Sequence, residues 1–197
     1  MDLRLFFTAL KDSARSWCKG RNWVVRLPIL VGFLYLFIKY LKEPMYFSML
    51  DWLNLGIHEL GHVMLMPFGQ FVSIMGGTLF QIAAPIFSVF NFYCQDDYFA
   101  IALSFGWLST SLFNSARYIA DARALELPLA SLFGSENTIH DWNYMLFRMH
   151  LLQHDILISN IVRFIASVSM LICLITGIWL LYVMVRNKNY SNTLIKY

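Results

Sequence analysis

The chain has few charged residues, and their scarcity excludes several classes of protein. Only 14% of its 197 residues are Asp, Glu, Lys or Arg, whereas a soluble domain carries about 25%. The formal net charge is +3, too small for a protein that binds nucleic acid through a broad basic surface. With 58% hydrophobic residues and a mean hydropathy of +0.56, the composition also excludes a disordered chain.

Cysteine is scarce as well. Cys18, Cys94 and Cys173 are odd in number, far apart and without a CxxC pair, which excludes a disulfide scaffold. The chain also lacks internal repeats and low-complexity linkers, so we expect one domain over residues 1–197.

What the sequence does have is long apolar runs. A membrane span needs about 20 apolar residues. Residues 98–116 and 164–185 are stretches of 19 and 22 residues without a charge, and residues 63–95 are a stretch of 33. The last of these is long enough for a turn at 67–70 followed by a span.

Two further spans are expected nearer the N-terminus. Residues 27–38 are apolar, and Arg26, Lys39 and Lys42 can extend from the ends toward the headgroups, so we extend this helix to about 23–41. Residues 43–67 are apolar but contain several ionisable groups. The prediction is an all-α, polytopic transmembrane helix bundle of about five spans, in contact with the lipid bilayer and without nucleic acid.

Two segments are expected outside the spans. Apolar residues recur at helical spacing before residue 18, with Arg4, Lys11, Arg15 and Lys19 among them. This pattern is typical of a helix that lies in the membrane interface, and a basic tail without structure is the alternative. Residues 121–155 form the largest region outside the membrane, a helical segment on the cytoplasmic side.

The distribution of Lys and Arg predicts a cytoplasmic N-terminus. Five spans then place ten of the fifteen basic residues inside. The basic C-terminal tail is the exception, because an odd number of spans places it outside. The compact chain without a targeting signal indicates a bacterial inner membrane.

The motif that carries chemistry is His58-Glu59-Leu60-Gly61-His62, an HExxH sequence. Residues four apart share one face of a helix, so His58 and His62 can bind one metal ion. Zinc acidifies a bound water, and Glu59 is the candidate general base beside it. A pair of hydrogen-bonded core histidines is the alternative, although it leaves Glu59 unexplained. Ionisable groups within a membrane are costly and usually functional.

HELGH within an apolar helix resembles the intramembrane zinc metalloproteases of the site-2 protease class. The stretch from His58 to about Asp155 also resembles a group of small, uncharacterised bacterial membrane proteins with similar features. The resemblance implies zinc on His58 and His62 and Glu59 as general base. That class usually supplies a third ligand from the Asp of a Leu-Asp-Gly motif, and no Asp-Gly occurs in this sequence.

A catalytic zinc site needs a third protein ligand. We favour Asp141, because a carboxylate beside two imidazoles completes a common hydrolytic site, with a helix N-cap as its alternative role. Asp121 and His140 are the other candidates. His150 and His154 are four residues apart and can also pair on a metal, but they lack a carboxylate base between them. Asp51 lies too far back on the helix and is a candidate to hydrogen-bond a ligand.

Three residues are candidates for positioning a substrate. Gly77, next to Gly76, offers either a backbone edge for an extended peptide or close helix packing. Gln81 is able to donate to an oxyanion or to bond a neighbour. Asn114 is able to orient a carbonyl or to join two helices.

The sequence thus predicts zinc-dependent hydrolysis of a peptide bond in a membrane protein or peptide. The alternatives are a membrane zinc protein without proteolytic activity and a small transporter or scaffold. A homodimer or a partner subunit is compatible with so small a bundle.

Overall fold

The computed structural model describes residues 2–127 and 140–194, and within them the chain contains helices and no strand. This confirms the predicted all-helical class. The α-helices are α1 (Leu3–Trp17), α2 (Leu27–Lys42), α3 (Met49–Leu65), α4 (Gln70–Cys94), α5 (Tyr98–Ala120), α6 (Asp141–Arg148) and α7 (Asp155–Leu194).

Helix boundaries follow from local chemistry. The Asp2 carboxylate accepts a hydrogen bond from the backbone N–H of Arg4 at the start of α1, and Asp97 does the same for Ala100 at the start of α5. Such caps satisfy N–H groups that have no partner within the helix. Between α3 and α4 the chain turns through Met66–Phe68 to Gly69, whose φ of 96° suits glycine.

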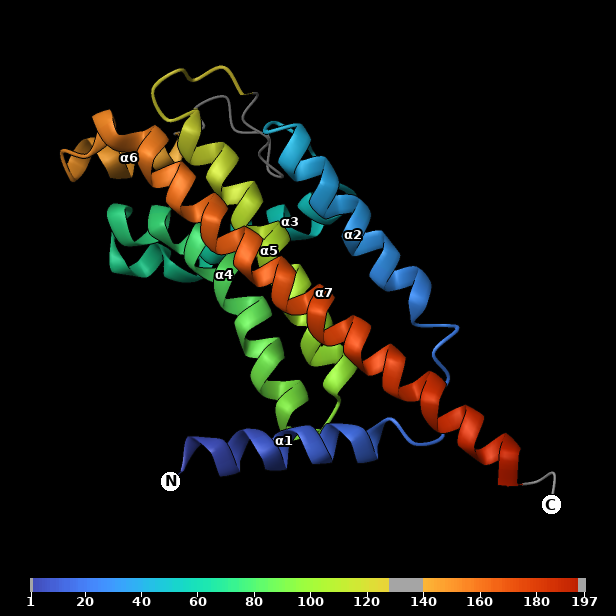
Figure 1. Cartoon of the computed structure of the whole chain (residues 1–197). Helices are drawn as coiled ribbons and strands as arrows, with labels where there is room; N and C mark the ends of the chain where they lie inside the picture. The colour runs from blue at the N-terminus through green and yellow to red at the C-terminus, as the bar shows by residue number, and fades with distance from the viewer. Residues whose placement is uncertain (1, 128–139, 195–197) are drawn as a thin grey trace.

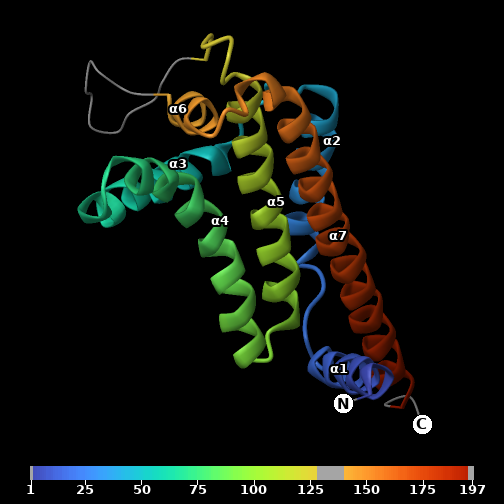
Figure 2. The same ribbon diagram turned by 90° about the vertical axis from the view of Figure 1, so that its left-hand side faces the viewer.

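The helices fall into two orientations. Helices α2, α4, α5 and α7 run along the long axis of the molecule, as Figures 1 and 2 show. Helix α1 lies across one end, where α7 also ends, whereas α3 and α6 lie at the opposite end. Helix α4 starts beside α3 and bends as it turns along α5, and Pro85 lies inside it. A proline within a helix removes one hydrogen bond and kinks the chain.

Helices α5 and α7 form the centre of the bundle. Three serine hydroxyls donate across their interface to backbone carbonyls at 2.7 Å: Ser109 to Ala166, Ser159 to Ala116 and Ser169 to Phe105. Small and hydroxylic residues at helix contacts are typical of proteins in lipid, because they allow close approach and bond between helices. A buried cluster that includes Met170, Cys173 and Leu180 extends this core toward α1.

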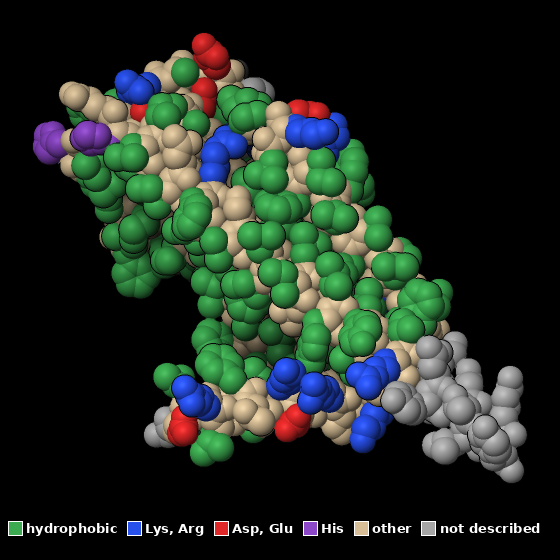
Figure 3. All heavy atoms as spheres, viewed as in Figure 1, with side chains coloured by type: hydrophobic (Ala, Val, Ile, Leu, Met, Phe, Trp, Pro, Cys, Tyr) green, Lys and Arg blue, Asp and Glu red, His purple; other side chains and the backbone are tan. Residues whose placement is uncertain are grey.

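Two helices are long and apolar enough to cross a membrane by length and composition, at Gln70–Cys94 and Leu152–Asn187. Figure 3 shows hydrophobic side chains over the middle of the molecule and charged ones toward its two ends. The charged end next to α1 is rich in Lys and Arg. This arrangement supports association with a membrane.

The expectation of five spans is not confirmed. Among the described residues only the two helices above have the length and composition of a span. The run at 43–67 forms α3, but α3 lies across the end of the bundle instead of running along it. Helix α3 is held across the end of the bundle by its capped start next to α2 and by the tight turn at Gly69 after its end.

The N-terminal segment that was expected to be a helix in the membrane interface does form a helix, α1. The segment 121–155 is only partly helical: α6 ends at Arg148, a 3-10 turn covers Leu152–His154, and residues 128–139 lie outside the described residues.

Candidate metal centre

Helix α3 carries both histidines of the HExxH motif, and its start is held by buried polar groups. The Asp51 carboxylate accepts a hydrogen bond from the backbone N–H of Ser48 at 2.7 Å. Ser48 Oγ in turn accepts one from the Tyr40 hydroxyl of α2 at 2.8 Å. Asp51 therefore caps α3 and is committed to that role, and it does not bond a ligand histidine. Because α3 is held in this way, His58 and His62 project from one face of a fixed helix.

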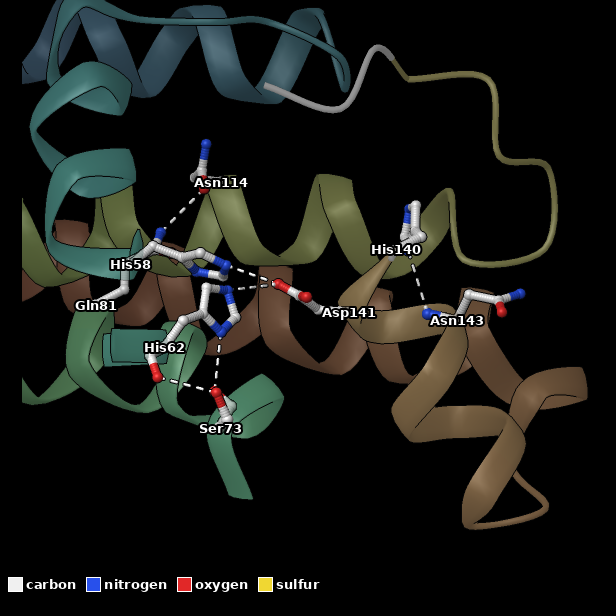
Figure 4. A network of polar contacts seen from close by, with 8 residues as sticks. All are labelled: His58, His62, Ser73, Gln81, Asn114, His140, Asp141 and Asn143. Atoms are coloured by element: carbon white, nitrogen blue, oxygen red, sulfur yellow. Dashed lines mark hydrogen bonds and ion pairs between the residues drawn. The ribbon is translucent and has the colours of Figure 1, made fainter. Parts of the chain in front are cut away.

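His58, His62 and Asp141 lie together, as Figure 4 shows. Asp141 Oδ2 is 2.8 Å from His58 Nε2 and 3.2 Å from His62 Nε2. The two imidazole rings are nearly perpendicular, with centroids 4.7 Å apart. The sequence separation between His58 and Asp141 is 83 residues, so the fold itself brings the carboxylate to the histidines.

The other nitrogen of each ring faces an acceptor. His58 Nδ1 lies 3.1 Å from Gln81 Oε1, and His62 Nδ1 lies 2.8 Å from the backbone carbonyl oxygen of Ser73. Oxygens of this kind only accept hydrogen bonds, so both Nδ1 atoms carry a proton. The lone pair of each Nε2 then faces Asp141, unless a second proton makes the ring an imidazolium.

The orientation of the Gln81 amide is fixed independently. Its Nε2 donates to the backbone carbonyl of Ser111 at 3.2 Å and to Asn114 Oδ1 at 2.9 Å. A carbonyl accepts only, so the nitrogen faces α5 and the oxygen faces His58. Gln81 is 2% exposed, which leaves no solvent to compensate for a lost partner.

These three side chains form a group that is able to hold a metal ion, and their donor types are those found in zinc sites. Two imidazole nitrogens and one carboxylate oxygen are a common catalytic set, with one position left open. Zinc bonds of 2.0–2.1 Å in tetrahedral geometry separate neighbouring ligand atoms by about 3.3 Å. The 3.2 Å between Asp141 Oδ2 and His62 Nε2 is close to that value, whereas the 2.8 Å to His58 Nε2 is the distance of a hydrogen-bonded ion pair. Ligating histidines also characteristically donate their second N–H to an oxygen acceptor.

Glycine at position 77 makes room for the two rings. A Cβ atom at Gly77 would lie 2.5 Å from His58 Nε2 and 2.7 Å from His62 Cε1. Gly76 beside it allows a different contact, because a Cβ there would lie 2.5 Å from the backbone oxygen of Gly61. The pair of glycines therefore brings α4 against both the backbone of α3 and the imidazoles.

Asp141 opens the short helix α6, which is anchored to the end of α5. Leu146 packs with Ile119 and Ala122, and the Asn143 side chain donates to the backbone carbonyl of Ala122 at 2.7 Å. Burial alone raises the pKa of the Asp141 carboxyl, but the hydrogen bonds and charge of His58 and His62 outweigh it. The pKa of Asp141 therefore lies below its usual value, and the group is a carboxylate near neutral pH.

Glu59 is half-buried on α3, next to the cluster in sequence. Within residues 2–127 and 140–194 its carboxylate has no hydrogen bond or ion pair, and it stands outside the three-residue metal group. Burial lowers the pKa of the His62 ring, but the hydrogen bond and charge of Asp141, the Ser73 carbonyl and the charge of Glu59 together raise it above its usual value. A carboxylate without a side-chain partner among the described residues is available to accept a proton.

The other two candidates for the third ligand have different partners. Asp121 accepts hydrogen bonds from the backbone N–H groups of Glu126 and Leu127. His140 caps α6, since its Nδ1 accepts from the backbone N–H of Asn143, and its ring stacks on Tyr118. His140 Nε2 lies 3.3 Å from Asp121 Oδ2 without the geometry of a hydrogen bond. The expected N-cap role thus belongs to His140, and Asp141 is free to face the histidines.

The histidine pair near the end of this segment is exposed. His150 follows α6 with a φ of 58°, and His154 ends the 3-10 turn before α7. Neither belongs to a metal group among the described residues.

The three residues expected to position a substrate hold the cluster instead. Gly77 is buried inside a helix against the histidine rings, which matches the close-packing alternative. Gln81 and Asn114 bond each other, and Gln81 bonds His58. In each case the alternative role of contact with a neighbour is the one observed.

Sequence reasoning missed Ser73. Its carbonyl accepts from His62, and its hydroxyl donates to the His62 carbonyl at 2.9 Å. Every residue has a backbone carbonyl, so the residue type does not show which carbonyl will accept a hydrogen bond. The available signal was the tight turn at residues 66–69, which folds the first turn of α4 back onto the end of α3.

Comparisons with known proteins add no relative: no family model, no curated protein and no solved structure matches the chain. A function therefore has to be inferred from the residues of the site.

Proposed function

We propose that the protein is a membrane-embedded, zinc-dependent peptidase that hydrolyses a peptide bond in a membrane-associated substrate. The observation that carries the proposal is the convergence of His58, His62 and Asp141, with both Nδ1 atoms held by oxygen acceptors. His58 Nε2, His62 Nε2 and Asp141 Oδ2 present their lone pairs to one another. Because lone pairs repel, a metal cation or additional protons must lie between these atoms. The neighbouring carboxylate of Glu59 is the reason to prefer catalysis to simple metal storage.

Each residue of the site has a defined task. His58, His62 and Asp141 hold the zinc, which when bound polarises a carbonyl and acidifies water. Glu59 takes a proton from the attacking water on its carboxylate and delivers it to the nitrogen of the leaving amine. Gln81 and Ser73 keep the protons on Nδ1 of the two rings, so that Nε2 remains a ligand atom.

The membrane arrangement that we propose has four spans, α2, α4, α5 and α7, in a bacterial inner membrane. Helix α4 has 25 residues and α5 has 23, which at about 1.5 Å per residue exceed the 30 Å apolar core of a bilayer. Helix α2 has 16 residues and reaches the interfaces through Arg26, Lys39 and Lys42. Helix α5 is less apolar because of its buried serines, of which Ser109 bonds α7 and Ser111 bonds Asn54 of α3.

The outer side of α3 supports a substrate held in lipid. Leu60, Val63 and Met64 are about half exposed and follow directly on Glu59. An apolar face of this kind, next to an HExxH motif, lies at the boundary between bilayer and site. A peptide segment anchored in the membrane can therefore approach the site from the plane of the lipid.

Metal content is the first test. The detergent-purified wild type is expected to contain about one zinc per chain, and His58→Ala and Asp141→Ala to contain none. Asp121→Ala is the matched control, because Asp121 caps a backbone turn outside the cluster, and it should retain zinc. A wild type without zinc after reloading would reject the proposal.

Catalysis is tested separately with Glu59→Gln, which should retain zinc. Bacterial membranes that contain the wild type should yield new peptide N-termini that are absent with Glu59→Gln. If the wild type and Glu59→Gln both contain zinc but neither yields new peptide N-termini, the peptidase proposal is rejected and the protein is a zinc protein without proteolytic activity.

A further inference from the structure

The two ends of the molecule differ in what they carry. Helix α1 and the end of α7 lie at one end, and His58, His62 and Asp141 lie at the other, near α6. This arrangement differs from the sequence-based expectation that the N-terminus and residues 121–155, which include Asp141, both lie on the cytoplasmic side. That expectation counted α3 as a crossing, whereas α3 lies across the end of the bundle.

The basic residues assign a side to each end. Arg4, Lys11, Arg15, Lys19, Arg21 and Arg26 precede α2, whereas only Lys39 and Lys42 stand between Ile38 and the start of α3. Lys and Arg near the first span usually determine orientation, and they remain in the cytoplasm. The end with α1 is therefore the cytoplasmic one.

Lys and Arg residues also lie at the end of the molecule that carries the metal centre, where they would favour the opposite orientation. They count less toward the orientation, because most of them are paired with other groups of the protein. Arg117 donates to the Tyr46 carbonyl and lies 4.0 Å from the Asp51 carboxylate. Arg123 pairs with Asp155 at 2.8 Å, and Lys39 pairs with Glu43 at 2.7 Å. Four spans also return the end of α7, with Arg186, to the cytoplasm. The basic C-terminal segment that five spans left outside then agrees with the positive-inside rule.

We infer that the metal centre opens on the extracytoplasmic face of the membrane, opposite both ends of the chain. Its substrates are then peptide segments presented at the outer leaflet, and this choice of substrate rests on the proposed peptidase function. Helix α3 and the turn after it lie across that end, with Val63, Met66 and Phe68 exposed. They fit the outer interface, where water can reach Glu59.

Cysteine labelling tests the sidedness. Native Cys94 is exposed at the end of α4, on the α1 side, whereas Cys18 and Cys173 are buried and provide a low background. Gln153 is exposed between α6 and α7. The two probes are the wild type, which reports on Cys94, and Gln153→Cys in a Cys94→Ser background. Cys94→Ser alone measures the background, and labelling in detergent gives the full signal.

In intact bacterial spheroplasts, a membrane-impermeant maleimide should label Gln153→Cys and spare Cys94 until the membrane is permeabilised. Protection of Gln153→Cys before permeabilisation would overturn the inference, and so would labelling of Cys94 in intact spheroplasts. Phe147 is also exposed and lies on α6. If position 153 reacts poorly in detergent, Phe147→Cys repeats the measurement.

Zinc content of the same preparations separates this inference from the proposed function. The predicted labelling without zinc would reject the metal centre and leave the orientation standing. Zinc with the reversed labelling would reject the orientation alone.

Discussion

At the scale of single residues, the orientation of both imidazoles depends on groups outside the cluster of His58, His62 and Asp141. Gln81 holds His58, the Ser73 carbonyl holds His62, and Gly77 leaves the space in which the two rings meet. Supporting residues of this kind commonly change metal affinity by about 10- to 100-fold. They are therefore the places where small substitutions should have large effects.

The first prediction concerns Gly77→Ala. The added Cβ would lie 2.5 Å from His58 Nε2, so a ring has to move away from Asp141. We expect the purified protein to lose most of its zinc, measured by metal analysis. Gly56→Ala is the matched control in α3, since a Cβ there meets nothing within 4 Å. Equal zinc in the two variants would show that Gly77 does not shape the site.

The second prediction concerns Gln81→Leu, which keeps side-chain volume but removes the acceptor for His58 Nδ1. Zinc affinity, measured by competition with a chelator, should fall about 10- to 100-fold. Ser88→Ala removes a hydroxyl from the same helix that only bonds the Ala84 carbonyl, and it should retain wild-type affinity. An unchanged affinity in Gln81→Leu would mean that the ring is held by other contacts.

Much of the site was accessible from the sequence because helical spacing is local. The four-residue separation of His58 and His62 places them on one face of any helix. Asp141 followed from the chemistry of a third ligand, although two other candidates fitted equally simple arguments. The partners of Asp121 and His140 depend on how the chain folds after α5, and residue type alone does not show that.

At the scale of helices, α5 and α7 are joined by hydroxyl-to-carbonyl bonds instead of by large interlocking side chains alone. In lipid, apolar packing between helices competes with equally apolar lipid tails, so such bonds contribute directly to helix association. Each is worth about 0.6 kcal/mol in measured membrane proteins.

The third prediction follows from these bonds. The triple variant Ser109→Ala, Ser159→Ala and Ser169→Ala should lose about 2 kcal/mol of unfolding free energy in detergent, the sum of three such bonds. The control triple is Ser88→Ala, Ser104→Ala and Ser115→Ala, whose hydroxyls bond carbonyls four residues back in their own helices. Equal melting temperatures for the two triples would show that the bonds between helices add nothing.

Helix existence was predictable from apolar runs, but helix direction was not. The sequences of α3 and α4 are both apolar, yet α3 lies across the bundle and α4 turns along it. The difference arises from the close contact of Gly61 with Gly76 and from the burial of Asp51 and Asn54 against other helices. These are pairings between distant residues, which hydropathy along a single chain does not contain.

At the scale of the whole molecule, the proposed four crossings make a prediction that five would contradict. Helix α1 and the end of α7 lie at the same end of the structure, so both chain termini should face one compartment. Epitope tags at the two ends of the chain should become accessible to antibody together, only after spheroplasts are permeabilised. Antibody access to only one of the two tags before permeabilisation would indicate an odd number of spans.

The distance along the chain between His58 and Asp141 also bears on biosynthesis. The ribosome makes the 83 residues that separate them in about 4 to 17 seconds at 5–20 residues per second. During that interval the nascent chain carries two imidazoles without their carboxylate, and α5 has yet to receive α7. The three side chains can therefore meet only after Asp141 has been made, while all of α7 is still to be synthesised.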